Sequence, residues 1–597
     1  MEKVERTFRY NVNRRRFLRD STLATLGLVA AACAGVQVPG GGTSGKKKGG
    51  EFHGAWPYDL PPKGTYNYFA GATGLLAGGV YTDLFIPSLA MWNWADGKWI
   101  YFLAESSKLS GNVFEVKLRP NLKWADGAAF TSKDVVTTYQ IGRMEGFGIW
   151  SYIDKVEAAG DLTVNFNYKT PSSLGERLIL RNAIRPDSQF GAIAKKAADF
   201  YAAGKTTTSD EIKALRTELA ALRPTAPPSI GPYKIDPASV NEAQLTLTRN
   251  ETGLFGKDVN FDKVVIYNGE TTQVTPLVLA GDIDYATHGF PTATEKGFTD
   301  AGLRIMRSPA YSGPALVFHW EKAAAFQDKR LRQAIAYAVN RGELAKITFG
   351  VDSQQKFMAG IPDEIVPLWV NEADQKKLNA YANDQKKASD LMTAAGYAKG
   401  SDGIWAKGGT KLEFELYFPS DFADWSASAD YLQKSLNTFG IKITPRGAIR
   451  STQLPDVNEG KFQLAIMGWA IGNPHPQGSY VQDLRTHNTT PAGGGYKYPL
   501  KQKTDAFGDI DLNALIDEMG VGFDTNAQKA TVTKMALAFN ELLPVIPLAE
   551  RFGNNPINEK ARVTGWKPDG DKVYKNSFGT DNFTVLMIMD GTLYTTK

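Results

Sequence analysis

Residues 113–136 read VFEVKLRPNLKWADGAAFTSKDVV and carry the clearest local signals for the fold. The first six, Val113–Leu118, alternate apolar and polar side chains with a period of two, which is typical of a half-buried strand. Asp126-Gly127 is a dipeptide that favours a tight turn. Thr131 or Ser132 can cap an amphipathic helix that follows the turn. The stretch therefore predicts a strand, a turn and a helix in succession.

The same patterns recur along the rest of the chain. Alternating side chains predict further strands at residues 162–168 and 244–249. Apolar residues spaced three and four apart predict helices that begin after Asp328 and after Asp384, and another that ends at Gly440. No internal repeat is apparent, and 597 residues are too many for one core. We therefore expect an α/β protein of two to four domains.

The composition excludes several classes of protein. Apolar residues make up 43% and charged residues 22% of the chain, which is typical of a globular protein. A single cysteine excludes a disulfide scaffold and a cysteine-ligated zinc site or cluster, and five scattered histidines predict no metal site and no cofactor. Beyond residue 50 the chain has 58 basic and 60 acidic side chains, which argues against nucleic acid as a partner.

Residues 1–33 have the features of an export signal. The run Arg14-Arg-Arg-Phe-Leu-Arg19 resembles the twin-arginine signal, with Arg14 and Arg15 as its pair; the alternative is an ordinary secretory signal rich in arginine. The apolar run that follows is too short to span a bilayer. Cys33 comes after three alanines and resembles the lipidated cysteine of bacterial lipoproteins, although alanine replaces the usual leucine three positions before it.

Residues 34–54 are predicted to form a flexible linker rich in glycine and lysine. Three consecutive lysines, Lys46, Lys47 and Lys48, supply positive charge close to the expected lipid. A single lipid holds a protein to a membrane more firmly when a basic segment supplements it. We therefore expect an exported, lipid-anchored protein in the periplasm or on the outer face of the cell membrane.

No catalytic motif stands out in the sequence. The chain lacks GxSxG, HExxH, and a GxGxxG that leads into a helix. Asp282 and Asp284 lie two apart in a strand-like segment, and such a pair leaves a secreted glycosidase open as a remote alternative. A turn residue next to a solvated strand residue is the simpler explanation of that pair.

Longer motifs resemble family 5 solute-binding proteins of ABC importers, which bind peptides, nickel or oligosaccharides. The motifs occur in the family's order and cover most of residues 80–550. They are Leu103-Ala-Glu-Ser106, Phe114-Glu-Val-Lys-Leu-Arg-Pro120, Lys123-Trp-Ala-Asp-Gly127, Phe130-Thr-Ser-Lys-Asp-Val-Val136, Ile230-Gly-Pro-Tyr-Lys234, Leu247-Thr-Arg-Asn250, Leu279-Ala-Gly-Asp-Ile-Asp-Tyr285, Phe326-Gln-Asp-Lys-Arg-Leu-Arg-Gln-Ala-Ile-Ala-Tyr-Ala338 and Ala394-Ala-Gly-Tyr397.

The resemblance implies a two-lobed clamshell, similar to type II periplasmic binding proteins, with an additional inserted β-rich domain. The implied parts are lobe I at residues 55–85, 180–310 and 545–597, the inserted domain at 86–179, and lobe II at 311–544. It implies a binding protein and not an enzyme, which closes on a solute by a hinge motion and delivers it to the transmembrane permease subunits of an importer. We expect a monomer that binds no nucleic acid and meets the membrane through its lipid anchor.

Charge in the implied cleft distinguishes peptide from sugar as the solute. A buried peptide ammonium needs a carboxylate partner, and peptide-binding relatives place an Asp shortly after a Gly-Trp-like segment. Here residues 467–480 read MGWAIGNPHPQGSY, and no acid follows until Asp483. Neutral side chains, among them Asn473 and His475, fill the stretch and suit hydroxyl groups.

Twelve tryptophans also favour a carbohydrate, because indole faces stack on pyranose rings. From the family positions we expect Trp469 and Trp320 to stack on the solute, with Trp92 as a further contact and His319 as a hydrogen-bonding partner. The sequence therefore favours an oligosaccharide-binding protein. The alternative is an oligopeptide-binding protein of the same family, with its acid supplied by Asp421, Asp424 or Glu321.

Overall fold

The computed structural model describes residues 47–61, 64–69, 79–490 and 493–596. The export signal at 1–33, with Arg14, Arg15 and Cys33, and most of the linker lie outside the described residues. None of the described helices combines the length and the apolar character needed to cross a membrane.

Lobe I is built around a four-stranded sheet in the order β1-β10-β9-β8, in which β1 runs parallel to β10 and the other pairs are antiparallel. The strands are β1 (Glu51–Ala55), β10 (Lys263–Tyr267), β9 (Gln244–Arg249) and β8 (Tyr233–Asp236). The predicted linker through residue 54 is therefore too long. Phe52 is fully buried in the core of lobe I, so the chain joins the sheet from Glu51 onward.

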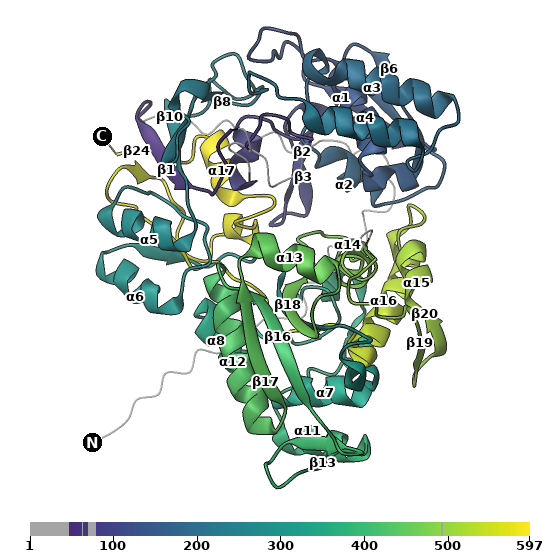
Figure 1. The fold of residues 1–597 in the computed structure, drawn as a ribbon. Helices are drawn as coiled ribbons and strands as arrows, with labels where there is room; N and C mark the ends of the chain where they lie inside the picture. Colours follow the sequence, from purple (N-terminus) through teal and green to yellow (C-terminus); the bar gives the residue numbers. More distant parts are fainter. Residues whose placement is uncertain (1–46, 62–63, 70–78, 491–492, 597) are drawn as a thin grey trace, which may run out of the picture.

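The inserted domain contains the stretch that the sequence identified first. Its antiparallel sheet has the order β4-β5-β7-β6, and helices pack beside it, with α1 between β5 and β6 in the chain and the others after β7 (Figure 1). The elements are β4 (Ala104–Ser110), β5 (Val113–Leu118), α1 (Ser132–Met144), β6 (Ile153–Gly160), β7 (Thr163–Tyr168), α2 (Gly175–Leu180), α3 (Asp187–Ala202) and α4 (Asp210–Ala221). Thr131 caps α1, and Gly127 has a φ of 89°, which confirms the predicted helix start and the turn before it.

Two of these helices lie beyond the boundary that was predicted at residue 180. Ile141 and Met144 of α1 share one apolar cluster with Phe190 of α3 and Leu215 of α4. Helices α3 and α4, which were assigned to lobe I, thus pack on the inserted domain.

Lobe II has a five-stranded mixed sheet in the order β17-β16-β18-β12-β21. Its strands are β12 (Gly313–Phe318), β16 (Glu413–Pro419), β17 (Lys442–Ala448), β18 (Leu464–Trp469) and β21 (Ile546–Pro547). Its main helices are α7 (Lys329–Ala338), α8 (Arg341–Phe349), α11 (Gln385–Ala394), α12 (Ala423–Phe439), α13 (Arg450–Asn458), α15 (Leu512–Glu518) and α16 (Thr525–Leu542). Asp328 and Asp384 cap α7 and α11, and Gly440 ends α12 with a φ of 104°, as predicted.

The chain passes between the lobes twice, and the two passages pair with each other. Pro309 and Phe552 form an antiparallel bridge. The Ala310 N–H donates to the Arg551 carbonyl at 2.8 Å, and the Arg551 N–H donates to the Ser312 carbonyl at 2.7 Å. These two paired passages join the lobes, and we call them the hinge ribbon.

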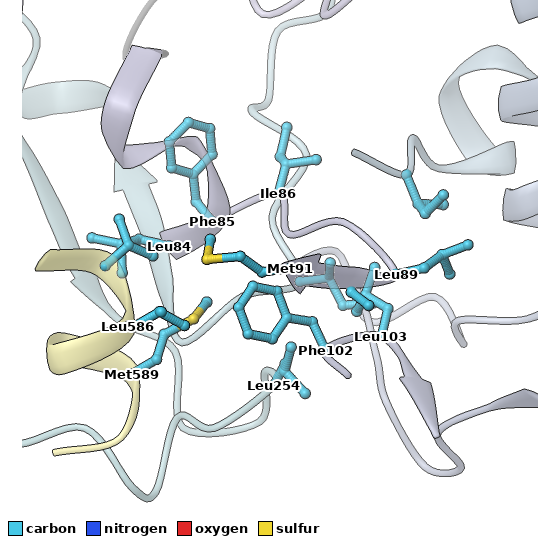
Figure 2. Close-up of a cluster of buried hydrophobic side chains, with 14 of the residues drawn as sticks. Leu84, Phe85, Ile86, Leu89, Met91, Phe102, Leu103, Leu254, Leu586 and Met589 are labelled. Atoms are coloured by element: carbon cyan, nitrogen blue, oxygen red, sulfur yellow. The ribbon is translucent and has the colours of Figure 1, made fainter. Parts of the chain in front are cut away.

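The core of lobe I continues into the inserted domain and includes the end of the chain. Figure 2 shows side chains from the segment 84–103 packed against Leu586 and Met589 of α17 (Phe583–Met589). Because one apolar cluster spans both parts, lobe I and the inserted domain form one packed unit. Lobe II has separate apolar clusters of its own.

Candidate functional site

The lobes face each other around the hinge ribbon, where β18 of lobe II ends. Trp469 is the last residue of β18, and the chain then leaves the sheet at Ala470, whose φ is 53°. The carboxylate of Asp483 accepts the Ala470 N–H at 2.8 Å. Burial raises the pKa of Asp483 well above its usual value. Asp483, the first acid after the Gly-Trp segment, therefore holds the backbone at Ala470 in place through this hydrogen bond.

Trp469 lies in the core of lobe II. Its side chain has no exposed surface, and its indole N–H donates to the carbonyl of Ala549 at 3.1 Å. Gly313, the residue paired with it on β12, leaves room for the ring: an added Cβ there would lie 3.0 Å from the indole nitrogen. In this conformation the ring offers no face for a solute to stack on.

His319 and Trp320 lie at the opposite end of β12 from Trp469. Gly313 pairs with Trp469 and Phe318 with Leu464, so the six-residue strand, about 17 Å long, separates the two ends. His319 is 4% exposed and packs on Phe462, and Trp320 packs on Tyr498 with ring centroids 5.0 Å apart. The structure thus does not bring the two expected stacking tryptophans together.

Asn473 and His475 lie in the loop after β18, close to each other and to the hinge side of lobe II. The Asn473 side-chain oxygen accepts the His475 N–H at 2.9 Å. The imidazole packs on Trp369 with ring centroids 4.5 Å apart, and burial lowers the pKa of His475 to about 4. The Trp369 indole donates to the Pro474 carbonyl at 2.9 Å. These contacts shape the loop, and a role in solute binding stays a prediction.

Trp92 is half-buried and packs on Trp99, whereas its neighbour Trp94 reaches the hinge ribbon. The Trp94 ring stacks on Tyr311 with centroids 4.0 Å apart and an angle of 17° between the planes. Tyr311 belongs to the first passage between the lobes and has a φ of 56°. The sequence gave no reason to select Trp94, because its partner Tyr311 is more than 200 residues away.

A buried carboxylate organises this side of the interface. Asp581 has no exposed surface and accepts hydrogen bonds from Arg177, Arg181 and the Trp94 indole at 2.8, 2.8 and 3.1 Å. Burial alone would raise the pKa of Asp581, but the two guanidinium groups hold it below its usual value. Arg177 also donates to the Gly472 carbonyl of lobe II at 3.1 Å. The sequence gave no signal for this cluster.

A cavity of about 640 Å³ opens beside the Trp94–Tyr311 stack, with walls from both lobes and from the hinge ribbon. Its lining combines aromatic rings with charges of both signs: Trp94, Tyr311, Phe552 and Tyr574, with Glu364, Asp569, Asp571, Arg307 and Lys575. Arg307 pairs with Glu295, and Asp569 pairs with Arg304. Among the described residues, the exposed side chains of Glu364 and Lys575 form no ion pair.

Two further acids lie behind Glu364 in lobe II. Glu550 is 4% exposed and accepts the Asp363 N–H at 2.7 Å. Burial, together with the charges of Glu364 and Asp363, raises the pKa of Glu550 well above its usual value, and burial raises the pKa of Asp363 to about 6. Glu550 and Asp363 are thus withdrawn from solvent, whereas the side chain of Glu364 is exposed on this wall of the cavity.

The other acids named from the sequence differ in position. Asp424, at the start of α12, is buried and pairs with Arg551 of the hinge ribbon at 3.2 Å. Burial and the charge of Asp421 raise the pKa of Glu270, on lobe I, to about 7, with a further contribution from Asp424. Asp421 and Asp424 therefore lie between the lobes, whereas Glu321 lies beside His319 at the far end of β12.

Asp282 and Asp284 do not form a carboxylate pair. They follow α5 (Thr271–Ala280) in a loop and not in a strand. Asp282 is exposed, whereas Asp284 is fully buried and pairs with Arg562 at 3.2 Å. No group of three or more His, Cys, Asp or Glu side chains in the described part of the chain could hold a metal ion.

Comparison with known proteins identifies the architecture. A family model of bacterial extracellular solute-binding proteins, family 5 (middle region), matches residues 98–490. The oligopeptide-binding protein AppA of Bacillus subtilis is 24% identical over 387 residues, which cover 62% of this chain and 65% of AppA. A putative ABC transporter peptide-binding protein of Brucella ovis is 23% identical over 58% of this chain and 59% of its own length. The chain thus aligns with less than two thirds of these relatives.

Solved structures have the same fold. AppA in complex with a nonapeptide superposes with a TM-score of 0.67 at 18% identity, over 92% of this chain and all of AppA. NikA from Brucella suis, solved with Fe(III)-EDTA, gives 0.70 at 19% identity, over 90% and 99%. A periplasmic oligopeptide-binding protein from Thermotoga maritima with bound mannohexaose gives 0.69 at 17% identity, over 92% and 99%. These likenesses confirm the predicted two-lobed α/β fold.

Proposed function

Because the chain belongs to the bacterial extracellular solute-binding proteins of family 5, which are transport binding proteins and not enzymes, we propose that it is the substrate-binding component of an ABC importer. It captures a solute between its lobes and delivers it to a membrane permease. The hinge ribbon at Pro309 and Phe552 supplies the joint, and the cavity beside it takes walls from both lobes. The export signal and the anchor at Cys33 would hold the protein outside the membrane.

For the solute, the charges of the cavity favour an oligopeptide. Glu364 of lobe II and Lys575 of lobe I are charges of opposite sign without ion-pair partners in the described part of the chain. A zwitterionic ligand, with an ammonium near Glu364 and a carboxylate near Lys575, compensates both charges, whereas a neutral sugar can form hydrogen bonds with them but compensates neither charge. This pair of free charges is the observation that carries the choice of solute.

An oligosaccharide, which the sequence favoured, is the second candidate. Trp94 and Tyr311 offer aromatic surface beside the cavity, and the loop 470–477 contains no acid. The buried position of Trp469 and the distance to Trp320 remove the two stacking partners that the sequence had suggested, and that weakens the case for a sugar.

A thermal-shift screen with mannohexaose and with peptides of two to nine residues tests the choice. A ligand at a hundred times its Kd stabilises the folded state by about 2.7 kcal/mol. We expect peptides to stabilise the protein, and Glu364→Gln and Lys575→Met each to weaken peptide binding about fivefold to tenfold. Glu372→Gln and Lys572→Met, whose side chains pair elsewhere on the surface, serve as matched controls.

Stabilisation by mannohexaose alone, unaffected by the two charge changes, would reverse the order of the candidates. Failure of every probe to bind, with the protein folded, would count against both solutes. Crosslinking to a permease in the native membrane tests the importer role separately from the identity of the solute.

A further inference from the structure

Lobe II also touches the inserted domain at a place apart from the hinge ribbon. The segment Pro171–Leu174 follows β7 in the inserted domain, and the segment Val521–Phe523 joins α15 to α16 in lobe II. Ser172 and Gly522 form a parallel bridge. In Figure 1 the two segments meet on the right of the molecule, where α2 lies above α15. We call this contact, together with Gln528 of α16, the interlobe clasp.

Main-chain hydrogen bonds form the centre of the clasp. The Gly522 N–H donates to the Pro171 carbonyl at 2.7 Å, and the Ser173 N–H donates to the Gly522 carbonyl at 2.9 Å. These lengths are those of well-formed N–H···O bonds. Since each bond joins one packed unit to the other, both break when the units separate by a few ångströms.

Gln528 holds the lobe II side of the clasp in place. Its side chain, 3% exposed, donates to the carbonyls of Val521 and Gly522 at 3.1 and 3.0 Å and accepts the Ser173 hydroxyl at 2.8 Å. These three hydrogen bonds serve the loop of lobe II and the opposite segment of the inserted domain. Gln528 thus fixes the loop in the conformation that pairs with the inserted domain.

Ring packing and glycine geometry complete the contact. Phe523 packs edge-on against Tyr168 of β7, with ring centroids 5.3 Å apart. Gly522 has a φ of 89°, in the left-handed region that favours glycine, and an added Cβ would meet nothing closer than 4.0 Å. A side chain at this position would therefore strain the backbone without a steric clash.

We propose that the interlobe clasp is a latch that stabilises the closed conformation independently of the solute. The hinge ribbon permits rotation of lobe II, and the clasp contributes its hydrogen bonds only when the rotation has brought the lobes together. Weakening the clasp then lowers the population of closed molecules, and it lowers the apparent affinity for every solute by the same factor. A residue that contacts the solute would instead change affinities selectively.

Gly522→Ala in the purified protein tests the latch, with Gly508→Ala as its matched control. Gly508 also has a positive φ, 66°, and open space at its Cβ, but it lies in the hairpin of β19 (Lys501–Thr504) and β20 (Gly508–Asp511). We expect Gly522→Ala to increase the radius of gyration without solute, measured by small-angle X-ray scattering. It should also remove hydrogen-exchange protection of the Ser173 amide, whereas Gly508→Ala changes neither.

Ser173→Ala is a milder second variant, because it removes one cross-lobe hydrogen bond and leaves the backbone as it is. It should raise the Kd of every solute that binds about twofold to tenfold. It should also raise the hydrogen-exchange rate of the amide at position 173 by a similar factor. Unchanged scattering and protection in Gly522→Ala would overturn the proposal. An affinity loss restricted to one class of solute would also overturn it. Scattering and hydrogen exchange are measured without solute, so these experiments test the latch separately from the importer role. Either proposal can be contradicted while the other stands.

Discussion

Two contacts between the lobes, the Asp581 cluster and the interlobe clasp, differ in what they would lose on opening. Beside the hinge ribbon, Asp581 and Arg177 both belong to the packed unit of lobe I and the inserted domain, and only the Gly472 carbonyl comes from lobe II. At the clasp, the paired groups belong to opposite units, as with Gly522 and Pro171. The charged contact therefore remains nearly complete when the lobes part, whereas the neutral contact disappears. In this comparison the buried charge belongs to the permanent framework, and the clasp consists of uncharged groups.

The largest effect is expected where this framework is broken. Asp581→Asn leaves Arg177 and Arg181 without their shared carboxylate in a buried site, and we expect a loss of about 3–5 kcal/mol in the free energy of unfolding. Asp569→Asn, which removes an ion pair with Arg304 from a side chain that is 71% exposed, should cost less than about 1 kcal/mol. Urea unfolding measures both, and equal losses would contradict the comparison.

Glu270 provides an intermediate effect, because it is a carboxylate that faces acids of the opposite lobe. The pKa of Glu270 is raised to about 7 from 4.5, so its contribution favours the folded state below about pH 4.5 and is lost as the pH rises through 7. Between low and high pH, this effect lowers the free energy of unfolding. Allowing for the partial exposure of Glu270, Glu270→Gln should remove about 2 kcal/mol of that decrease. Urea unfolding at pH 5 and pH 8 measures it, with Glu518→Gln as an exposed control. A pH dependence unchanged in Glu270→Gln would contradict the assignment.

The smallest effect compares the aromatic residues at the two ends of β12. Trp94→Ala should weaken binding of whichever probe stabilises the protein, by about 0.5–1.5 kcal/mol, because the ring borders the cavity. Trp320→Ala should leave that affinity unchanged. Titration calorimetry measures both, and Trp94→Phe keeps an aromatic surface while it removes the indole bond to Asp581. A larger loss with Trp320→Ala would return the site to the far end of the strand.

Local signals predicted the parts of the fold that depend on neighbours in sequence. Thr131, Asp328 and Asp384 cap helices because each side chain reaches an N–H only two or three residues away. Gly440 ends α12 because glycine readily adopts a positive φ. Such contacts depend on a few consecutive residues, and the sequence states them directly.

The site was harder to predict because its contacts join distant parts of the chain. Whether the indole of Trp469 is covered depends on Ala549, which is 80 residues away. Asp581 appears in the sequence as one loop aspartate among many, and its positive φ and two arginine partners arise only after folding. Family position indicated the loop 470–475, but it could not indicate which rings would be exposed beside it.

The place of α17 in the core of lobe I has a consequence for synthesis on the ribosome. The apolar cluster that begins with Phe52 is completed by Leu586 and Met589, so the first part to emerge must wait for the last. Lobe II, whose two clusters use residues 315–549 together with a few partly buried neighbours, has its own cores available earlier. The core of lobe I, although it contains the early residue Phe52, is thus completed last. A chain truncated before residue 583 has an incomplete core in lobe I, whereas lobe II can still fold.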